Sequence, residues 1–197
     1  MTHLIFGVRF DQPIVSYIPS STTHLSFDMD FDQKIKDCIP SIKYLRSGTN
    51  FYQLILGCIP RSVTELRLGW NFKESTNVIP STVTHLTFNG EFNNEINNNM
   101  IPKSVTHLTS NNFYNESMSK RIPSSVTHLT FIYVNQEIND NIPSVTHLTF
   151  GKKFNRSINN VPSSVIEIKL DREYDAVINE DVKIKSKNSV SMNRKHD

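Results

Sequence analysis

The sequence predicts a parallel β solenoid, a fold in which one short unit stacks on the next along a single axis. An Ile-Pro dipeptide returns every 19 to 22 residues. Each dipeptide is followed by a short run of alternating apolar and polar residues, as in a half-buried strand. The segments between these runs are short and rich in asparagine. A fixed period of this length is typical of a solenoid, whose extended surface suits binding rather than catalysis.

Proline marks the start of each predicted strand. It cannot donate a hydrogen bond to a sheet, and it favours an extended conformation in the residue before it. We therefore expect it to end the outer segment of one unit and to begin the strand of the next. The dipeptides are Ile18-Pro19, Ile39-Pro40, Ile59-Pro60, Ile79-Pro80, Ile101-Pro102, Ile122-Pro123, Ile142-Pro143 and the variant Val161-Pro162.

One well-formed unit shows the faces of the strand. Leu86 and Phe88 lie on one face, and His85 and Thr87 on the other. This frame recurs along the chain and predicts about nine short strands, with irregular or short helical segments on the opposite side. Residues 1–182 then hold about eight repeats and a partial first unit. A helical hairpin repeat is the alternative. It needs about 33 or more residues in each unit, and a proline about every 20 residues would break its helices.

The repeat resembles a known family. Residues 79–96 read Ile-Pro-Ser-Thr-Val-Thr-His-Leu-Thr-Phe and end in Phe-Asn-Asn-Glu-Ile, and residues 122–131 and 142–158 are further clear copies. This pattern is similar to the FNIP repeat, a leucine-rich-repeat relative of social amoebae and giant viruses of amoebae. The resemblance covers about residues 1–180. It implies a leucine-rich-repeat-like solenoid whose outward strand residues line a concave sheet.

The resemblance also implies a function for some members of the family. Many carry an F-box ahead of the repeats and act as ubiquitin-ligase adaptors, with the repeats choosing the substrate. This chain starts directly in a repeat, so we expect no F-box within it. An adaptor role would then need an F-box from another chain or from sequence upstream.

Composition narrows the classes of protein to which this chain could belong. The net charge of +2 gives no reason to expect nucleic acid as a partner. No apolar run is long enough to span a membrane, and the first residues do not resemble a signal peptide. We therefore expect a cytoplasmic protein, in the host cytoplasm if it is viral. Cys38 and Cys58 lie one repeat apart, within reach of a disulfide, but reduced core thiols are the favoured interpretation.

The outward residues of the strands should stack into two stripes. The histidine stripe consists of His3, His24, Tyr44, Glu65, His85, His107, His128, His147 and Glu167. The threonine stripe consists of Ile5, Ser26, Arg46, Arg67, Thr87, Thr109, Thr130, Thr149 and Lys169. The favoured interpretation of the histidines is a polar ladder of the repeat consensus, and a pH-sensitive surface is the first alternative. A metal site is less favoured, because a straight row of ligands does not converge on one ion.

Specific recognition is expected where the chain departs from its own consensus. In the third and fourth strands the outward His-Thr pair is replaced, and the only tryptophan follows closely. Tyrosine, tryptophan and arginine are enriched at binding hot spots. The candidate contact patch consists of Tyr44, Arg46, Glu65, Arg67 and Trp70. The alternative is drift of the repeat sequence. We identify no catalytic, metal-binding or cofactor-binding residue and expect no enzyme; Gly48, Gly69 and Gly151 are interpreted as turns.

The ends of the array differ from its middle. The first unit lacks its own Ile-Pro, so the edge of its strand would be open to a partner, to self-association or to upstream sequence. Residues 183–197 are polar and basic and are predicted to be a disordered tail. The sequence thus predicts an interaction scaffold that binds an unidentified protein with its concave sheet. An F-box-type adaptor and an inert product of repeat expansion are the alternatives.

Overall fold

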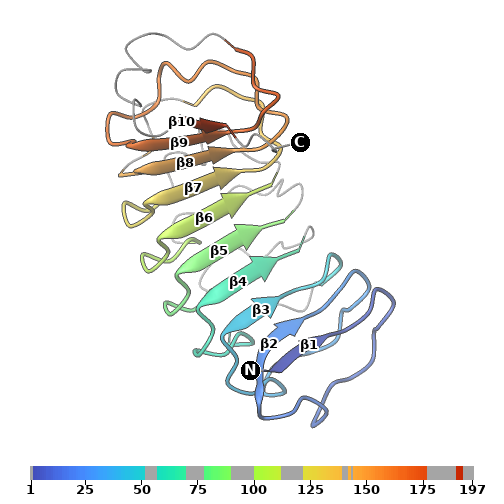
Figure 1. Ribbon diagram of the computed structural model, residues 1–197. Helices are drawn as coiled ribbons and strands as arrows, with labels where there is room; N and C mark the ends of the chain where they lie inside the picture. The colour runs from blue at the N-terminus through green and yellow to red at the C-terminus, as the bar shows by residue number, and fades with distance from the viewer. Residues whose placement is uncertain are drawn as a thin grey trace.

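The computed structural model shows one continuous sheet of short strands stacked along the length of the chain (Figure 1). It describes residues 2–51, 57–69, 78–89, 100–111, 122–138, 142, 144–176 and 190–192. The described strands are β1 (Thr2–Ile5), β2 (Thr22–Ser26), β3 (Tyr44–Arg46), β4 (Glu65–Leu68), β5 (His85–Phe88), β6 (His107–Ser110), β7 (His128–Phe131), β8 (His147–Phe150), β9 (Glu167–Leu170) and β10 (Val190–Met192). They lie in sequence order, and every neighbouring pair is parallel.

The nine strands predicted from the repeat are confirmed, and one more strand follows them. β10 pairs with β9 in parallel, with Val190 opposite Ile168. The prediction of a disordered tail over residues 183–197 missed this strand, because its three residues carry no Ile-Pro signal. The rest of that tail lies outside the described residues.

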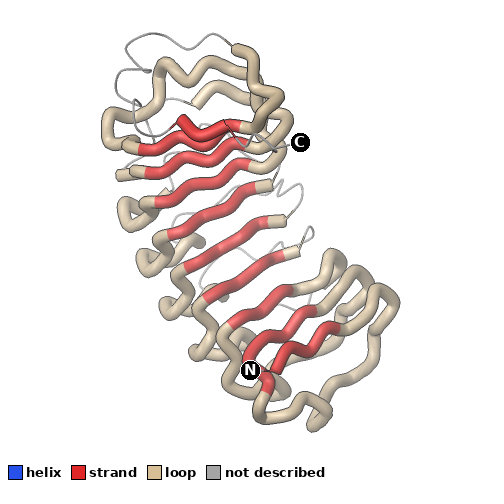
Figure 2. The backbone as a smooth tube through the Cα atoms, in the orientation of Figure 1, coloured by secondary structure: helices blue, strands red, loops and turns tan. Residues whose placement is uncertain are grey.

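Six of the described prolines begin a tight turn that leads into a strand, namely Pro19, Pro60, Pro80, Pro102, Pro123 and Pro162. The backbone carbonyl of Pro80 accepts a hydrogen bond from the amide of Val83 at 3.1 Å, and Pro102 accepts one from Val105 at 3.0 Å. Proline suits this position because the turn uses its carbonyl and leaves its missing N–H unneeded. The segments that return to the next turn contain no helix over the described residues, as expected for their length and asparagine content (Figure 2).

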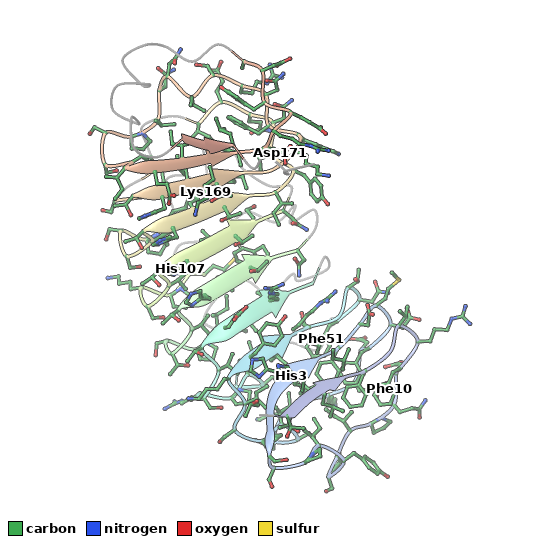
Figure 3. The ribbon with its side chains drawn as sticks, viewed as in Figure 1. His3, Phe10, Phe51, His107, Lys169 and Asp171 are labelled. Carbon is green, nitrogen blue, oxygen red and sulfur yellow. The ribbon has the colours of Figure 1, made fainter. Side chains whose placement is uncertain are left out.

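Inward residues of successive strands fill a single core. Leu25, Leu45 and Leu66 are fully buried one above another, and Phe31 is also fully buried. Burial of a side chain of this size contributes about 1.5–3 kcal/mol. In Figure 3, Phe10 and Phe51 lie on the side of the strands that faces the returning segments. Phe31 stacks between them, with centroids 6.0 Å and 5.8 Å away.

The spacing of equivalent side chains differs between the two faces of the sheet. Between β7 and β8, the ring centroids of His128 and His147 are 4.1 Å apart on the outward face. On the core side, the centroids of Phe131 and Phe150 are 5.9 Å apart. Strands themselves repeat at about 4.8 Å, which lies between these values. At this step the outward rings are thus closer together than the core rings, as in a wedge with its narrow end on the outward face.

A ladder of hydrogen bonds also runs along the returning segments, on the residue that follows a core side chain such as Phe10 or Val134. Asp11 Oδ1 accepts hydrogen bonds from the amide of Asp32 at 3.0 Å and from Gln33 Nε2 at 2.8 Å. Both bonds stabilise the carboxylate and hold the pKa of Asp11 below its ordinary value. Asn135 Oδ1 likewise accepts from the amide of Asn155 at 2.9 Å. The asparagine or aspartate at this position of the repeat thus joins consecutive units through its side-chain oxygen.

Three glycines after strands have a role beyond the predicted turns. Gly48, Gly69 and Gly151 do not adopt left-handed backbone angles, although the carbonyl of Gly151 accepts a hydrogen bond from the amide of Phe154 at 3.1 Å, as in a turn. A Cβ on Gly69 would lie 1.9 Å from the carbonyl oxygen of Gly48. Glycine is required there because two backbones pass too closely for any side chain. Cys38 and Cys58 are free thiols, the second buried, in agreement with the favoured interpretation.

Candidate functional site

The outward face of the sheet, here called the open face, carries the two predicted stripes. Strand pairing places His85 opposite His107, and His107 opposite His128. Thr87, Thr109 and Thr130 are aligned in the same way. The register of both stripes agrees with the sequence analysis, because a period-two strand fixes which residues face outward once one of them is placed.

The histidines of four consecutive strands stack ring on ring. The centroid of His107 is 4.1 Å from that of His85 and 4.2 Å from that of His128, with planes within 15°. His128 and His147 continue the stack. Rings this close exclude water from one another's faces, and stacking at this distance suits aromatic rings that carry no charge. At the other end, His3 and His24 form a separate pair at 4.2 Å.

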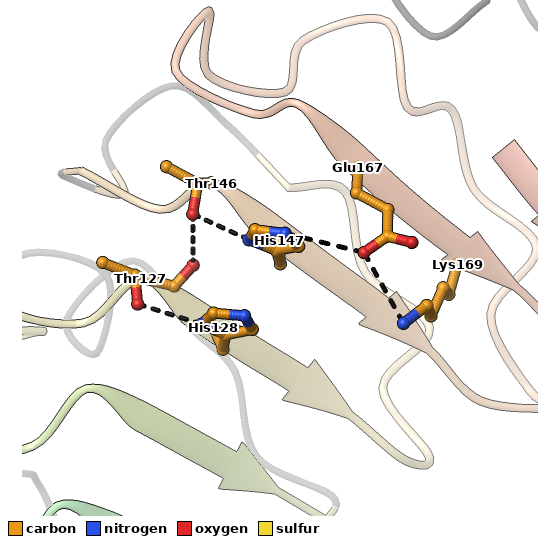
Figure 4. A network of polar contacts seen from close by, with 6 residues as sticks. All are labelled: Thr127, His128, Thr146, His147, Glu167 and Lys169. Atoms are coloured by element: carbon orange, nitrogen blue, oxygen red, sulfur yellow. Dashed lines mark hydrogen bonds and ion pairs between the residues drawn. The ribbon is translucent and has the colours of Figure 1, made fainter. Parts of the chain in front are cut away.

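A threonine before each of these histidines holds the ring. Thr146 Oγ1 lies 2.8 Å from His147 Nδ1 and 3.1 Å from the carbonyl oxygen of Thr127, as Figure 4 shows. When the hydroxyl donates to this carbonyl, its oxygen accepts from Nδ1–H, and Nε2 of the neutral ring remains an acceptor. The same Thr–His contact recurs in the repeats of His24, His85, His107 and His128, at 2.9–3.0 Å.

Stacking disfavours protonation of the inner rings. Burial lowers the pKa of His107, and the neighbouring charges of His85, His128 and His147 would lower it further. The pKa of His128 is also lowered, first by burial and then by His147, while Glu167 opposes the shift. The two inner rings, His107 and His128, are therefore held in the neutral form more strongly than a free histidine.

The stack does not form a metal centre. Its rings lie nearly parallel, so their ring-nitrogen lone pairs point side by side and do not meet at a point. A zinc ion needs ligand atoms at about 2 Å in a tetrahedral arrangement. The described part of the chain contains no group of three or more histidine, cysteine, aspartate or glutamate residues that could hold a metal ion.

The structure brings four residues of the candidate patch together on β3 and β4. Tyr44 lies opposite Glu65, and Arg46 lies opposite Arg67. Arg67 Nη2 is 3.4 Å from Glu65 Oε1, and the guanidinium carbon of Arg67 is 5.6 Å from the Tyr44 ring centroid. The Arg67–Glu65 pair is exposed, so it adds little to stability. Trp70 lies outside the described residues, and partner binding by the patch stays a prediction.

The threonines that hold the histidines were not identified from the sequence. The signal that identifies them is the Thr-His dipeptide, because a threonine precedes every histidine of the stripe. This threonine precedes the alternating residues of the strand, so it belongs to neither predicted stripe. A β-branched hydroxyl residue fits there, because its Oγ1 reaches both the ring and the carbonyl of the previous repeat.

The first strand leaves one edge of the sheet without a described partner. β1 pairs with β2, and no strand among the described residues lies on its other side. Ile5, at the end of β1, is 73% exposed, and Tyr17 in the following segment is 77% exposed. Over the residues described, no helix is long and apolar enough to cross a membrane.

Comparison with known proteins agrees with this geometry. The model of the FNIP repeat family matches residues 1–28, 15–50, 50–89, 75–109, 114–153 and 135–172. Among solved structures, the chain is similar to CroV588 of the giant virus CroV, described as a novel circular LRR protein, with 37% identity and a TM-score of 0.74. The match covers 98% of this chain and 30% of CroV588. No curated protein matches the sequence.

Proposed function

Because the chain belongs to the FNIP repeat family, we propose that it is a noncatalytic scaffold that binds a protein partner across the open face of its sheet. Its fold is a leucine-rich-repeat-like parallel solenoid, as the likeness to CroV588 supports. The chain spans about 30% of the length of CroV588, so nothing of that protein's assembly is carried over.

The observation that carries the proposal is a local change in the open face. Between the paired histidines of β1–β2 and the four-histidine stack of β5–β8, β3 and β4 present Tyr44, Arg46, Glu65 and Arg67 instead. The outward positions of β5–β8 carry only histidine and threonine, whereas this patch combines an aromatic ring with charges of both signs. An irregular patch beside a regular stretch of the face offers a partner a defined register on a repetitive surface.

Capture of a partner from native cytoplasm tests the proposal. A variant combining Tyr44→Ala, Arg46→Glu, Glu65→Lys, Arg67→Glu and Trp70→Ala should lose the protein that the wild type captures, as measured by quantitative mass spectrometry. A hot-spot residue contributes about 2 kcal/mol or more, so the loss should exceed about 30-fold. Equal capture by this variant and the wild type would refute the use of the patch.

A matched control lies elsewhere on the same chain. Lys153 Nζ stands 5.4 Å from the Tyr133 ring centroid, a second cation–aromatic pair that is not on β3 or β4. Tyr133→Ala with Lys153→Glu removes similar surface chemistry and should leave capture unchanged. Equal loss in both variants would indicate a general effect on charge or folding. The F-box adaptor role is not favoured by any feature of β1–β10 and stays a prediction from family resemblance.

A further inference from the structure

A polar hollow of about 270 Å³ lies at the carboxyl ends of β2–β6. Arg46 and Arg67 line it from the open face, and Asn89 and Asn111 line it from the residues that follow β5 and β6. Ser47 contributes to its wall, and Ser47 Oγ accepts a hydrogen bond from the amide of Gly69 at 2.9 Å. The hollow is therefore built by residues of several repeats on a rigid sheet and not by one mobile loop.

Two glycines bring the backbones of consecutive repeats close together in the wall of the hollow. The equivalent position is Asp28, Asn89 or Asn111 in neighbouring repeats, but it is Gly48 after β3 and Gly69 after β4. A Cβ at either glycine would lie within about 2 Å of a backbone oxygen of the previous repeat, at 2.0 Å for Gly48. The wall beside the two arginines is therefore formed by closely packed backbone and carries no side chain at these two positions.

The two arginines differ in how their charges are compensated. Arg67 contacts Glu65 and stands over the Tyr44 ring. Arg46 forms no ion pair with any residue that the structure describes, although Asp28 lies on the same rim. Arg46 and Arg67 also lie directly opposite each other, an arrangement that costs stability in the free chain. A bound anion would relieve that repulsion.

We propose that this hollow binds a carboxylate group of an acidic side chain on the protein partner. The inference rests on the proposed function and names the chemistry that the patch recognises. A guanidinium group binds a carboxylate through two parallel hydrogen bonds, and the amides of Asn89 and Asn111 supply further donors beside it. Drug-sized ligands occupy about 300–1,000 Å³, so a hollow of 270 Å³ suits one side-chain group better than a nucleotide or cofactor.

Binding of a hexaglutamate peptide to the full chain tests the proposal without an identified partner. Titration followed by amide chemical shifts should show saturable binding that weakens with salt, centred on residues around Arg46 and Asn89. Arg46→Gln should weaken binding about tenfold. Arg61→Gln, which removes the same charge from an exposed residue outside the hollow, should not. Hexaglutamine, the uncharged peptide, should not bind.

The outcomes separate this proposal from the broader one. Equal weakening by Arg46→Gln and Arg61→Gln, or no hexaglutamate binding by the folded wild type, would overturn the carboxylate site. Displacement of the peptide by inorganic phosphate at concentrations where acetate is ineffective would also overturn it, in favour of a phosphate site. If capture from cytoplasm depends on the patch while hexaglutamate does not bind, only this inference fails. If hexaglutamate binds while capture is unaffected, only the proposed function fails.

Discussion

His128 stacks on His147 with ring planes inclined by only 7°, and His147 Nε2 in turn lies 3.7 Å from Glu167 Oε2. The row of imidazoles therefore ends against a carboxylate, which itself lies 3.5 Å from Lys169 Nζ. A proton on His147 meets an opposite charge, whereas a proton on His107 has only histidines on either side. Burial and the neighbouring rings thus disfavour a charge on the inner histidines His107 and His128.

The first prediction is that acid destabilises the folded chain. His107 and His128 have a lower pKa in the folded chain than the ordinary histidine value of 6.5, so they bind fewer protons when folded. The free energy of unfolding should then be largest above pH 6.5 and should fall as the pH drops through 6.5 toward the folded pKa values. The two rings also face four other titratable or charged groups, whose charges determine how much of the free energy of unfolding is lost. These groups are His85, His147, Glu167 and Lys169. Urea unfolding at a series of pH values between neutrality and mild acid measures it.

A histidine-depleted variant provides the control for this prediction. His107→Gln with His128→Gln removes both inner titrating groups and keeps polar side chains on the open face. Its unfolding midpoint should depend less on pH over the same interval. An unchanged pH dependence would show that other groups, such as the carboxylates, account for the effect.

The second prediction concerns the asparagine ladder. Asn155 Oδ1 accepts the amides of Asp175 at 3.3 Å and Ala176 at 3.0 Å, so one side chain ties two repeats together. Asn155→Ala should lower the free energy of unfolding by about 1–2 kcal/mol, because a net hydrogen bond contributes about 1 kcal/mol. The measurement is the urea midpoint. Asn160→Ala, at an exposed position outside the ladder, should have little effect, and equal losses would contradict a special role for Asn155.

The Ile-Pro period is sufficient to predict the sheet of β1–β9 and its register. Once the period places His85 and His107 at equivalent positions, alternation along the strand fixes which residues face the core. The juxtaposition of Tyr44 with Glu65, and of Arg46 with Arg67, follows from the same rule. These features were predictable because parallel in-register stacking leaves no freedom between units.

Contacts that depend on the third dimension were not predictable. The asparagines of the returning segments bind the backbone of the next repeat with their side chains, as for Asn155, and the repeat period does not indicate this contact. Gly48 and Gly69 were interpreted only as turns, because the sequence does not show how closely two backbones approach. β10 carries no repeat signature, so its pairing with β9 is seen only in the structure. The hollow beside Arg46 is lined by residues of several repeats and was missed because it depends on how their side chains meet.

The third prediction concerns the open edge of β1. Among the described residues, β1 has a strand on one side only, and Ile5 is exposed at its end. Such an edge is a template for a further strand, and we predict concentration-dependent self-association through it. Ile5→Lys places a charge at this edge and should shift the chain toward monomer in sedimentation velocity. Ile166→Lys changes another exposed isoleucine that is remote from β1 in sequence and in sheet order. Monomeric wild type at all concentrations, or equal effects of both substitutions, would refute the prediction.

The fourth prediction compares two glycine substitutions that should change the free energy of unfolding in opposite directions. A Cβ at Gly151 would lie 2.1 Å from the carbonyl oxygen of Ile132, a backbone atom that cannot move without disturbing the ladder between β7 and β8. Gly151→Ala should therefore lower the free energy of unfolding by about 1–3 kcal/mol or more. A Cβ at Gly7 meets nothing within 4 Å, and neither glycine has a left-handed backbone. Gly7→Ala should raise stability by about 0.4–1 kcal/mol, because alanine restricts the unfolded chain. Urea unfolding of both variants is the measurement. If close backbone approach matters, Gly151→Ala lowers stability and Gly7→Ala raises it. If losing any glycine is costly in itself, both variants are less stable than the wild type.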